Sequence, residues 1–220
     1  MRKSLFTIVL ALLLAVPVAV SAQGLGIAGR AGTLGIGGEV ALDLGESLVA
    51  RAGFGLMPFE PSITIGDMDV TLKLPEKWYN VGLDLYLGGS FRLGAGMLFK
   101  SEDPSLVGNF TTSQDIGGRT FTPSELGTLT GVIDSEDRAP YALIGFGKHT
   151  SSGIGLFLDL GAAMLGEPNF TLAATGGTFG DQAELQTRLD AEAQSLEDEA
   201  GPYLKFWPII NIGLRIGVGG

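Results

Sequence analysis

The sequence has no cysteine, one histidine and few charged residues. The lack of Cys excludes disulfide scaffolds, cysteine-ligated zinc or iron–sulfur sites, and thiol catalysis. Asp, Glu, Lys and Arg make up only 17% of the 220 residues, against about 25% in an ordinary soluble domain. The net charge of −10 excludes a nucleic-acid partner, which would need a basic surface. A mean hydropathy of +0.32 is too apolar for a disordered chain, and the 35 Gly residues show no collagen period.

The first 22 residues have the order of a secretory signal peptide. Met1-Arg2-Lys3 is a basic start, an apolar run covers 5–20, and Val20-Ser21-Ala22 supplies the small residues of a cleavage site. We expect cleavage after Ala22, which leaves 23–220 as one domain; an uncleaved membrane anchor is the alternative. Removal of two of the 14 Lys and Arg residues leaves 12 against 24 acids, a net charge of −12.

After Ala22 the sequence has no apolar run of the roughly 18 residues that a membrane helix needs. A chain that crosses a bilayer without helices must form a closed β-barrel, because lipid cannot satisfy open sheet edges. The remaining question is whether the sequence alternates as the strands of such a barrel do.

Hydrophobicity alternates with a period of two along most of the remaining chain. In 33–44, aliphatic residues at even positions share one face, while Glu39 and Asp43 share the other face with small residues. The same pattern recurs in six further segments, at 48–56, 81–87, 91–99, 142–146, 154–160 and 206–218. The series predicts an all-β fold, a transmembrane antiparallel β-barrel. A soluble β-sandwich is the alternative, but the Gly-rich polar faces favour a narrow lumen.

The pattern allows eight to ten strands. Four hairpins are predicted, centred near Gly45, Gly89, Glu136 and Gly166. They supply eight strands, 203–218 supplies a ninth and 24–31 a tenth, which brings both termini to one side as bacterial barrels require. We favour ten strands; eight follow if 126–134 belongs to a loop.

Three stretches do not alternate. Residues 58–69 and 101–125 are polar, contain Pro and are predicted to be loops. Residues 181–200 predict a helix with seven acids, one Arg and a stripe of three leucines, stopped by Gly201-Pro202. This acidic helix precedes the last strand, and we expect its leucine stripe to pack on the barrel rim or in the barrel mouth.

The candidate functional residues are charged side chains on the Gly-rich faces. Four acids and four bases are predicted to face the lumen: Glu39, Asp43, Arg51, Asp84, Arg92, Lys148, Asp159 and Arg215. In a small barrel such ions must pair or stay hydrated. They either form a salt-bridged filling that fixes the strands, or they line a narrow polar pore. Four aromatic residues near strand ends are predicted to form girdles at the lipid headgroups: Trp78, Tyr79, Tyr203 and Trp207.

The sequence offers no catalytic, cofactor or metal site. His149 is followed by Thr and Ser residues, but a nucleophile needs a base held by a third group and an oxyanion site. We interpret His149 as a turn residue. The loop acids lack the spacing of a calcium-binding loop. No enzyme activity and no cofactor are therefore expected.

Several strings together resemble a family of small Gram-negative outer-membrane β-barrel proteins, among the porin-like and OmpA-like barrels. They are GTLGIGGEVALDL (32–44), DLYLGGSFRLGAG (84–96), APYALIGFGK (139–148), GLFLDLGAAMLGEP (155–168) and KFWPIINIGLRIG (205–217). The resemblance implies the outer membrane as location, its lipid and lipopolysaccharide as partners, and passage through the outer-membrane assembly machinery. Such barrels usually end in an aromatic residue that this machinery reads, whereas this chain ends Gly-Val-Gly-Gly.

The resemblance implies no particular activity. We expect an outer-membrane barrel, favoured as a monomer, with a structural or passive-permeability role. A narrow porin-type channel for small hydrophilic solutes is the first alternative. Surface adhesion or lipopolysaccharide contact through 101–125 and 181–200 is the second.

Overall fold

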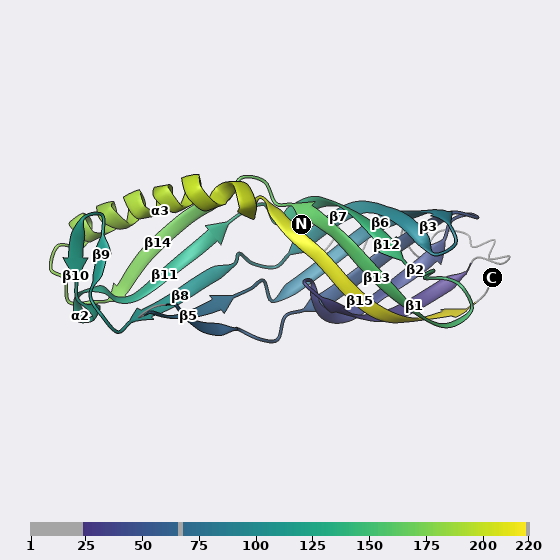
Figure 1. Ribbon diagram of the computed structural model, residues 1–220, viewed down its shortest axis with the longest axis horizontal. Coiled ribbons are helices and arrows are strands. Elements are labelled where there is room, and N and C mark those ends of the chain that lie inside the picture. The colour runs from purple at the N-terminus through teal and green to yellow at the C-terminus, as the bar shows by residue number, and fades with distance from the viewer. Residues whose placement is uncertain (1–23, 66–67, 219–220) are drawn as a thin grey trace, which may run out of the picture.

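The computed structural model describes residues 24–65 and 68–218. The predicted signal peptide, 1–22, lies outside the described residues. The described chain is elongated, with a β-barrel at one end and an extension of a sheet, a hairpin and two helices at the other (Figure 1).

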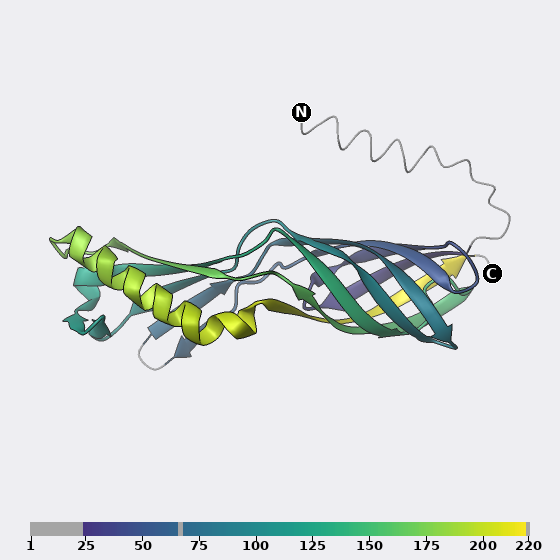
Figure 2. The same ribbon diagram turned by 90° about the horizontal axis from the view of Figure 1, so that it is seen from above.

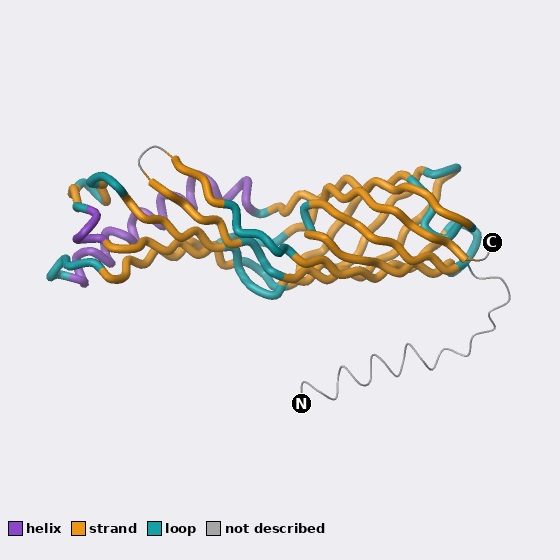
Figure 3. The backbone as a smooth tube through the Cα atoms, turned by 90° about the horizontal axis from the view of Figure 1, so that it is seen from below, coloured by secondary structure: helices purple, strands orange, loops and turns teal. Residues whose placement is uncertain are grey.

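Eight antiparallel strands close the barrel, in the order β1-β15-β13-β12-β7-β6-β3-β2. They are β1 (Leu25–Gly32), β2 (Gly35–Asp43), β3 (Leu48–Leu56), β6 (Lys77–Gly88), β7 (Phe91–Lys100), β12 (Arg138–Phe146), β13 (Gly153–Met164) and β15 (Phe206–Val218). The first and last strands of the chain pair along their length, from Leu25 opposite Val218 to Gly32 opposite Asn211. The predicted closed antiparallel barrel is therefore confirmed. Figure 3 shows the barrel from the side.

The alternation of apolar residues in the sequence separates the side chains that face the barrel interior from those on its outer surface. On β15 the side chains of Ile210, Ile212 and Leu214 are about half exposed on the outer face, whereas Ile209 and Asn211, on either side of Ile210, are buried. Successive strand residues point to opposite faces, so one strand presents an aliphatic outer surface and a mixed interior. The barrel has its core inside, beneath a continuous apolar outer belt.

The prediction of ten barrel strands is wrong, because two of the predicted strands lie in the extension. Residues 126–134 and the strand after Gly166 form β11 (Gly127–Asp134) and β14 (Asn169–Gly176), which pair with each other outside the barrel. Their aliphatic side chains, including Leu129 and Leu172, pack in a cluster beneath helix α3 rather than on the outer face of a barrel. The opposite face of β11 carries Thr residues. Helix α3 covers the apolar face of this sheet, whereas the apolar outer face of the barrel is exposed, so alternation alone does not separate the two cases.

The extension is built from strands in the long connections at one end of the barrel. A five-stranded sheet has the order β14-β11-β8-β5-β4, where β4 is Ser62–Ile65, β5 Met68–Lys73 and β8 Ser105–Phe110. A hairpin of β9 (Gln114–Ile116) and β10 (Arg119–Phe121) and the short helix α2 (Pro123–Leu126) lie at its far end (Figure 1). The prediction of loops at 58–69 and 101–125 is therefore wrong. These strands have three to six residues, too few for a recognisable period, and are held by pairing with their neighbours.

The helix predicted before the last strand is confirmed as α3 (Gln182–Leu204), which runs along the extension (Figure 2). Its N-cap is Asp181, whose side chain accepts a hydrogen bond of 3.0 Å from the backbone N–H of Glu184. The predicted stop at Gly201-Pro202 is wrong, because the helix continues to Leu204. Pro202 lies in the last turn, where the missing N–H removes only one intrahelical bond. Among the described residues, no helix is long and apolar enough to cross a membrane.

The leucine stripe of α3 packs on the extension rather than on the barrel rim or in its mouth. Leu185 and Leu189 are buried in one cluster with Ile116, Phe121 and Leu172. The ends of the described chain, Leu25 and Val218, lie opposite each other at the barrel end away from the extension (Figure 1).

Candidate functional site inside the barrel

Six of the eight charged residues predicted to face the lumen are buried. They are Glu39 on β2, Arg51 on β3, Asp84 on β6, Arg92 on β7, Asp159 on β13 and Arg215 on β15. Each occupies an inward position of its strand, where the flanking residues face outward. The barrel thereby brings together side chains that are distant in the sequence, such as Arg51 and Asp159, which are 108 positions apart.

Arg51 is at the centre of this group. Its guanidinium nitrogens lie 3.5 Å from Glu39 Oε1, 2.8 Å from Asp84 Oδ2 and 2.9 Å from Asp159 Oδ2. The three carboxylates come from three different strands, β2, β6 and β13. One planar guanidinium with five N–H donors can serve several acceptors at once, which a lysine ammonium does less well. Arg51 therefore ties together the strands on both sides of the barrel.

Two further arginines complete the ion pairs. Arg92 lies 3.3 Å from Asp84 Oδ2 and also pairs with Asp159, while Arg30 on β1 lies 3.5 Å from Glu39 Oε2. Arg30, Arg51 and Arg92 contribute three positive charges against three carboxylates, so the group is electrically balanced. Balance matters because an unpaired charge in such a buried position would carry a large desolvation cost.

His149 closes the barrel end that lies away from the extension. Its Nε2 is 2.6 Å from Glu39 Oε1, its Nδ1 is 3.2 Å from the Tyr86 hydroxyl, and its ring centroid lies 4.6 Å from that of Phe157, with the two rings tilted by 49°. The Tyr86 hydroxyl in turn accepts a 3.0 Å hydrogen bond from the backbone N–H of His149. His149 is in a turn as expected, but the turn folds inward and its imidazole joins the ion-pair group.

Glycines make room for this inward turn. A Cβ atom on Gly26 of β1 would collide with the carbonyl oxygen of His149, and one on Gly217 of β15 would collide with that of Ser151. Arg215 on β15 also holds this turn, because it donates hydrogen bonds to the carbonyl oxygens of Ser151 and Gly153. His149 and Thr150 are thus held inside the barrel mouth, where both are buried.

The other two predicted charged residues lie at the rim of the same end. Asp43 is partly exposed and Lys148 is exposed. Both line an open depression of about 240 Å³ together with Glu46 and Ser47. Lys148 directly precedes the inward His149, and the change of direction at this turn carries the Lys148 side chain into solvent.

At the opposite end, toward the extension, the interior is apolar. Trp78 is fully buried and its ring centroid lies 4.8 Å from that of Trp207. Leu34, Leu98 and Ile209 are buried in the same cluster. The indole N–H of Trp207 donates a 3.2 Å hydrogen bond to the carbonyl oxygen of Thr33 in the turn between β1 and β2.

The four predicted girdle aromatics therefore separate into two pairs. Trp78 lies inside the barrel mouth and Trp207 packs on it, so neither occupies the outward position of a girdle residue. Both indoles are at inward positions of their strands, because β6 and β15 each begin one residue earlier with an outward side chain. Tyr79 is half exposed on the outer face of β6, and Tyr203 is exposed near the end of α3.

Between the apolar cluster and the ion pairs, little empty space remains. A cavity of about 10 Å³ is lined by Arg30, Asn80, Tyr141 and Asn211 among others. This is about the volume needed for one water molecule. In the described part of the chain, no three His, Asp or Glu side chains are arranged to hold a metal ion.

The alternation places Asn211 on the inward face of the last strand, whereas Arg30, Asn80 and Tyr141 were not predicted as interior residues. The sequence does contain a signal for Arg30. In the segment 24–31, Arg30 and Ala28 are two positions apart and therefore share one face of the strand, while Ile27 and Ala31 lie on the other, outward face. Nothing in the sequence near His149 indicates that the turn bends inward, because its partners Glu39 and Tyr86 lie on other hairpins.

No protein-family model and no curated protein matches this sequence. Among solved structures, CarO of Acinetobacter baumannii is similar at 20% identity and a TM-score of 0.60, covering 87% of this chain and 96% of CarO. CarO2 of the same organism has 20% identity and a TM-score of 0.64, with 90% and 100% covered. A major outer membrane protein from Thermus thermophilus has 13% identity and a TM-score of 0.43, with 90% and 100% covered. The two CarO similarities show that this chain shares the fold of CarO.

Proposed function

We propose that this protein is an integral outer-membrane β-barrel with a structural or passive-permeability role, whose lumen is closed by paired ions. The observation that carries the proposal is the position of Arg51, which contacts carboxylates from three strands at 2.8–3.5 Å in the middle of the barrel. Side chains that meet in this way occupy the space that a pore would need. An eight-stranded barrel is only just wide enough to be filled by its own side chains.

Two further features support a closed lumen. The Trp78–Trp207 cluster fills the barrel mouth at the extension end, and the turn with His149 fills it at the other end. The cavity between them holds about 10 Å³. A hydrated solute would have to displace both ends and the ion pairs, so the closed state is the one that this packing favours.

The outer face supports a membrane location. β15 has 13 residues, and its outward side chains are predominantly apolar from Phe206 to Val218. At a rise of about 3.3 Å per residue and a tilt of about 40°, such a strand spans about 30 Å, enough for an apolar band of about 25 Å. Outer-membrane lipid and lipopolysaccharide are the partners that this belt fits. We place the strand ends Leu25 and Val218 in the periplasm and the extension outside the cell.

The proposal is tested by locating the protein and measuring permeability. We expect it in the outer-membrane fraction, with a mass that corresponds to cleavage after Ala22. Unboiled protein should migrate differently from boiled protein on a denaturing gel. Liposomes that contain it should swell no faster in small sugars or amino acids than empty liposomes do.

Rapid swelling would overturn the closed lumen in favour of a narrow porin-type channel. Extraction from the membrane by carbonate would overturn the barrel's integral placement. The extension is the part available for surface adhesion or lipopolysaccharide contact. That alternative would be favoured if deletion of 181–200 abolished cell-surface binding while the barrel still assembled.

A further inference from the structure

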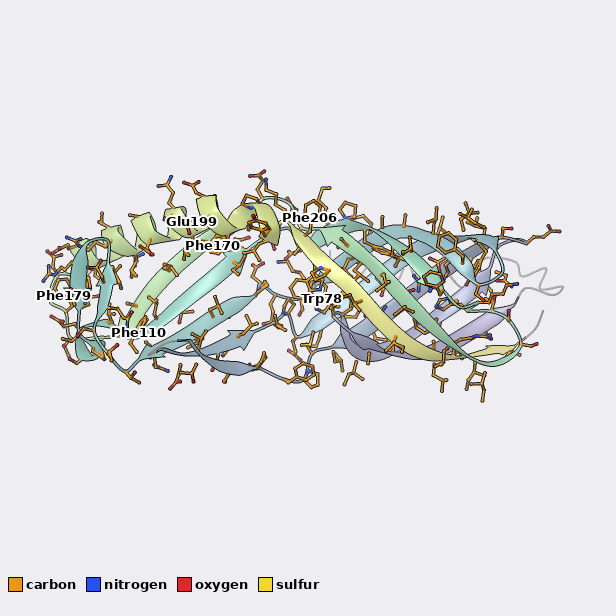
Figure 4. The ribbon with its side chains drawn as sticks, viewed as in Figure 1. Trp78, Phe110, Phe170, Phe179, Glu199 and Phe206 are labelled. Carbon is orange, nitrogen blue, oxygen red and sulfur yellow. The ribbon has the colours of Figure 1, made fainter. Side chains whose placement is uncertain are left out.

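A groove in the extension lies between α3 and the five-stranded sheet. It has a volume of about 300 Å³. Its floor is made of the buried side chains Ile116, Leu172 and Leu189, and Phe110 lines it at the end of β8. Figure 4 shows Phe110 far from Trp78, which lies at the barrel mouth, so this groove is separate from the barrel interior. The size is in the range of small-molecule sites, which are mostly apolar with a few polar groups.

The groove exists because α3 covers only part of the sheet. The helix lies along β14 and reaches β9 at the far end. The first leucines of its stripe are buried there, but the last, Leu196, remains 37% exposed, as does Leu106 on β8 opposite. Gly108 and Gly131 also line the groove.

Carboxylates stand at the edge of this apolar surface. Glu192 of α3 and Asp115 of the β9–β10 hairpin both line the groove and both are exposed. The cations nearby are engaged elsewhere: Arg119 and Arg188 both bind the carboxylate of Glu184, at 2.9–3.1 Å. Within residues 24–65 and 68–218, neither Glu192 nor Asp115 forms an ion pair. The edge of the groove is therefore negatively charged.

We propose that this groove binds a small amphipathic cation, with its apolar body on Leu106, Leu172 and Leu189 and its positive group beside Glu192 and Asp115. The charge at the edge selects for a cation over a neutral or anionic molecule of the same shape. The apolar floor selects for a hydrocarbon or aromatic body over a simple metal or polyamine cation. This site does not depend on whether the barrel conducts.

Three probes of one shape test the charge selection: 4-phenylbutylamine, 4-phenylbutanol and 4-phenylbutanoate. Binding to the full barrel in phosphatidylcholine nanodiscs is measured by titration calorimetry at low salt, with empty nanodiscs subtracted. We expect the amine to bind most tightly and the carboxylate most weakly. Glu192→Gln should weaken the amine about two- to fivefold, the range for an exposed charge pair, and leave the alcohol unchanged.

Two more variants separate the groove from general charge effects. Glu197→Gln removes the same charge about 140° further round α3, away from the groove, and should leave the amine affinity within twofold. Leu106→Trp fills the groove and should abolish binding of all three probes; a heat-dependent gel shift and helical circular dichroism establish that this variant is folded. Equal affinity for amine and alcohol, or equal losses in Glu192→Gln and Glu197→Gln, would overturn the proposal.

Discussion

Arg51 on β3 and Asp159 on β13 pair directly across the barrel, with Arg51 Nη1 2.9 Å from Asp159 Oδ2. Three strands separate β3 from β13 in either direction around the barrel. The two residues are 108 positions apart in the sequence. A contact between opposite walls fixes the width of the barrel and places side chains where a pore would lie.

Loss of Arg92 should destabilise the barrel more than loss of any exposed charge. Arg92→Ala leaves Asp84 and Asp159 with fewer partners in a buried position. We expect a loss of roughly 3 kcal/mol, the lower end for breaking a buried pair, because Arg51 still contacts both acids. The measurement is urea unfolding in lipid vesicles, followed by the fluorescence of Trp78 and Trp207. Lys148→Ala is the control and should change the unfolding free energy by less than about 0.5 kcal/mol. Equal effects of the two substitutions would contradict the ion-pair account.

Gly145 should be intolerant of a methyl group because Arg92 lies against it. A Cβ atom at Gly145 would collide with the Arg92 guanidinium, whereas one at Gly45 in the turn after β2 would meet nothing within 4 Å. We expect Gly145→Ala to cost about 1–3 kcal/mol through overpacking. Gly45→Ala should be close to neutral in the same unfolding experiment. An unchanged free energy of unfolding for Gly145→Ala would contradict this prediction, because it would show that the Arg92 side chain can move away from the added methyl group at no cost.

The stability of the extension should fall in acid through Glu184. Hydrogen bonds from the Arg119 and then the Arg188 guanidinium hold the pKa of Glu184 below its usual range. A group with a lowered folded pKa stabilises the folded state above its unfolded pKa, about 4.3, and this contribution is lost as pH falls through the folded value.

The urea midpoint of the helical circular dichroism signal measures this effect. We expect the wild-type midpoint to fall further between pH 7 and pH 3 than that of Glu184→Gln, which has no carboxylate to protonate. Glu197→Gln should keep the wild-type pH dependence. Parallel curves for wild type and Glu184→Gln would contradict the assignment.

The sequence predicts the strands of the barrel well and those of the extension poorly, for a physical reason. In long strands such as β15, exposed apolar side chains alternate with buried ones over 13 residues, and this alternation can be read directly from the sequence. β11 alternates too, but helix α3 covers its apolar face. The apolar face of β11 is covered by a helix that follows about 50 residues later in the chain. No pattern within the strand itself indicates this.

The sequence predicts that these charged residues face the interior, but it does not predict which of them form ion pairs with one another. The parity of Glu39, Arg51 and Asp159 on their strands places them on inward faces. Their pairing depends on the closure of the barrel and on the stagger of its strands, which are global properties. Strand parity is also what misplaces Trp78 in a girdle, since an aromatic residue at a strand end can point either way.

The most direct test of the closed lumen is single-channel recording in planar bilayers at neutral pH. The account predicts no conductance steps for the wild type, and discrete steps or flicker for the double variant Arg51→Ala/Arg92→Ala, in which the guanidiniums that meet Asp84 and Asp159 are gone. Stable conductance of the wild type, with an ion selectivity that Arg51→Ala alters, would contradict the account and identify a narrow channel.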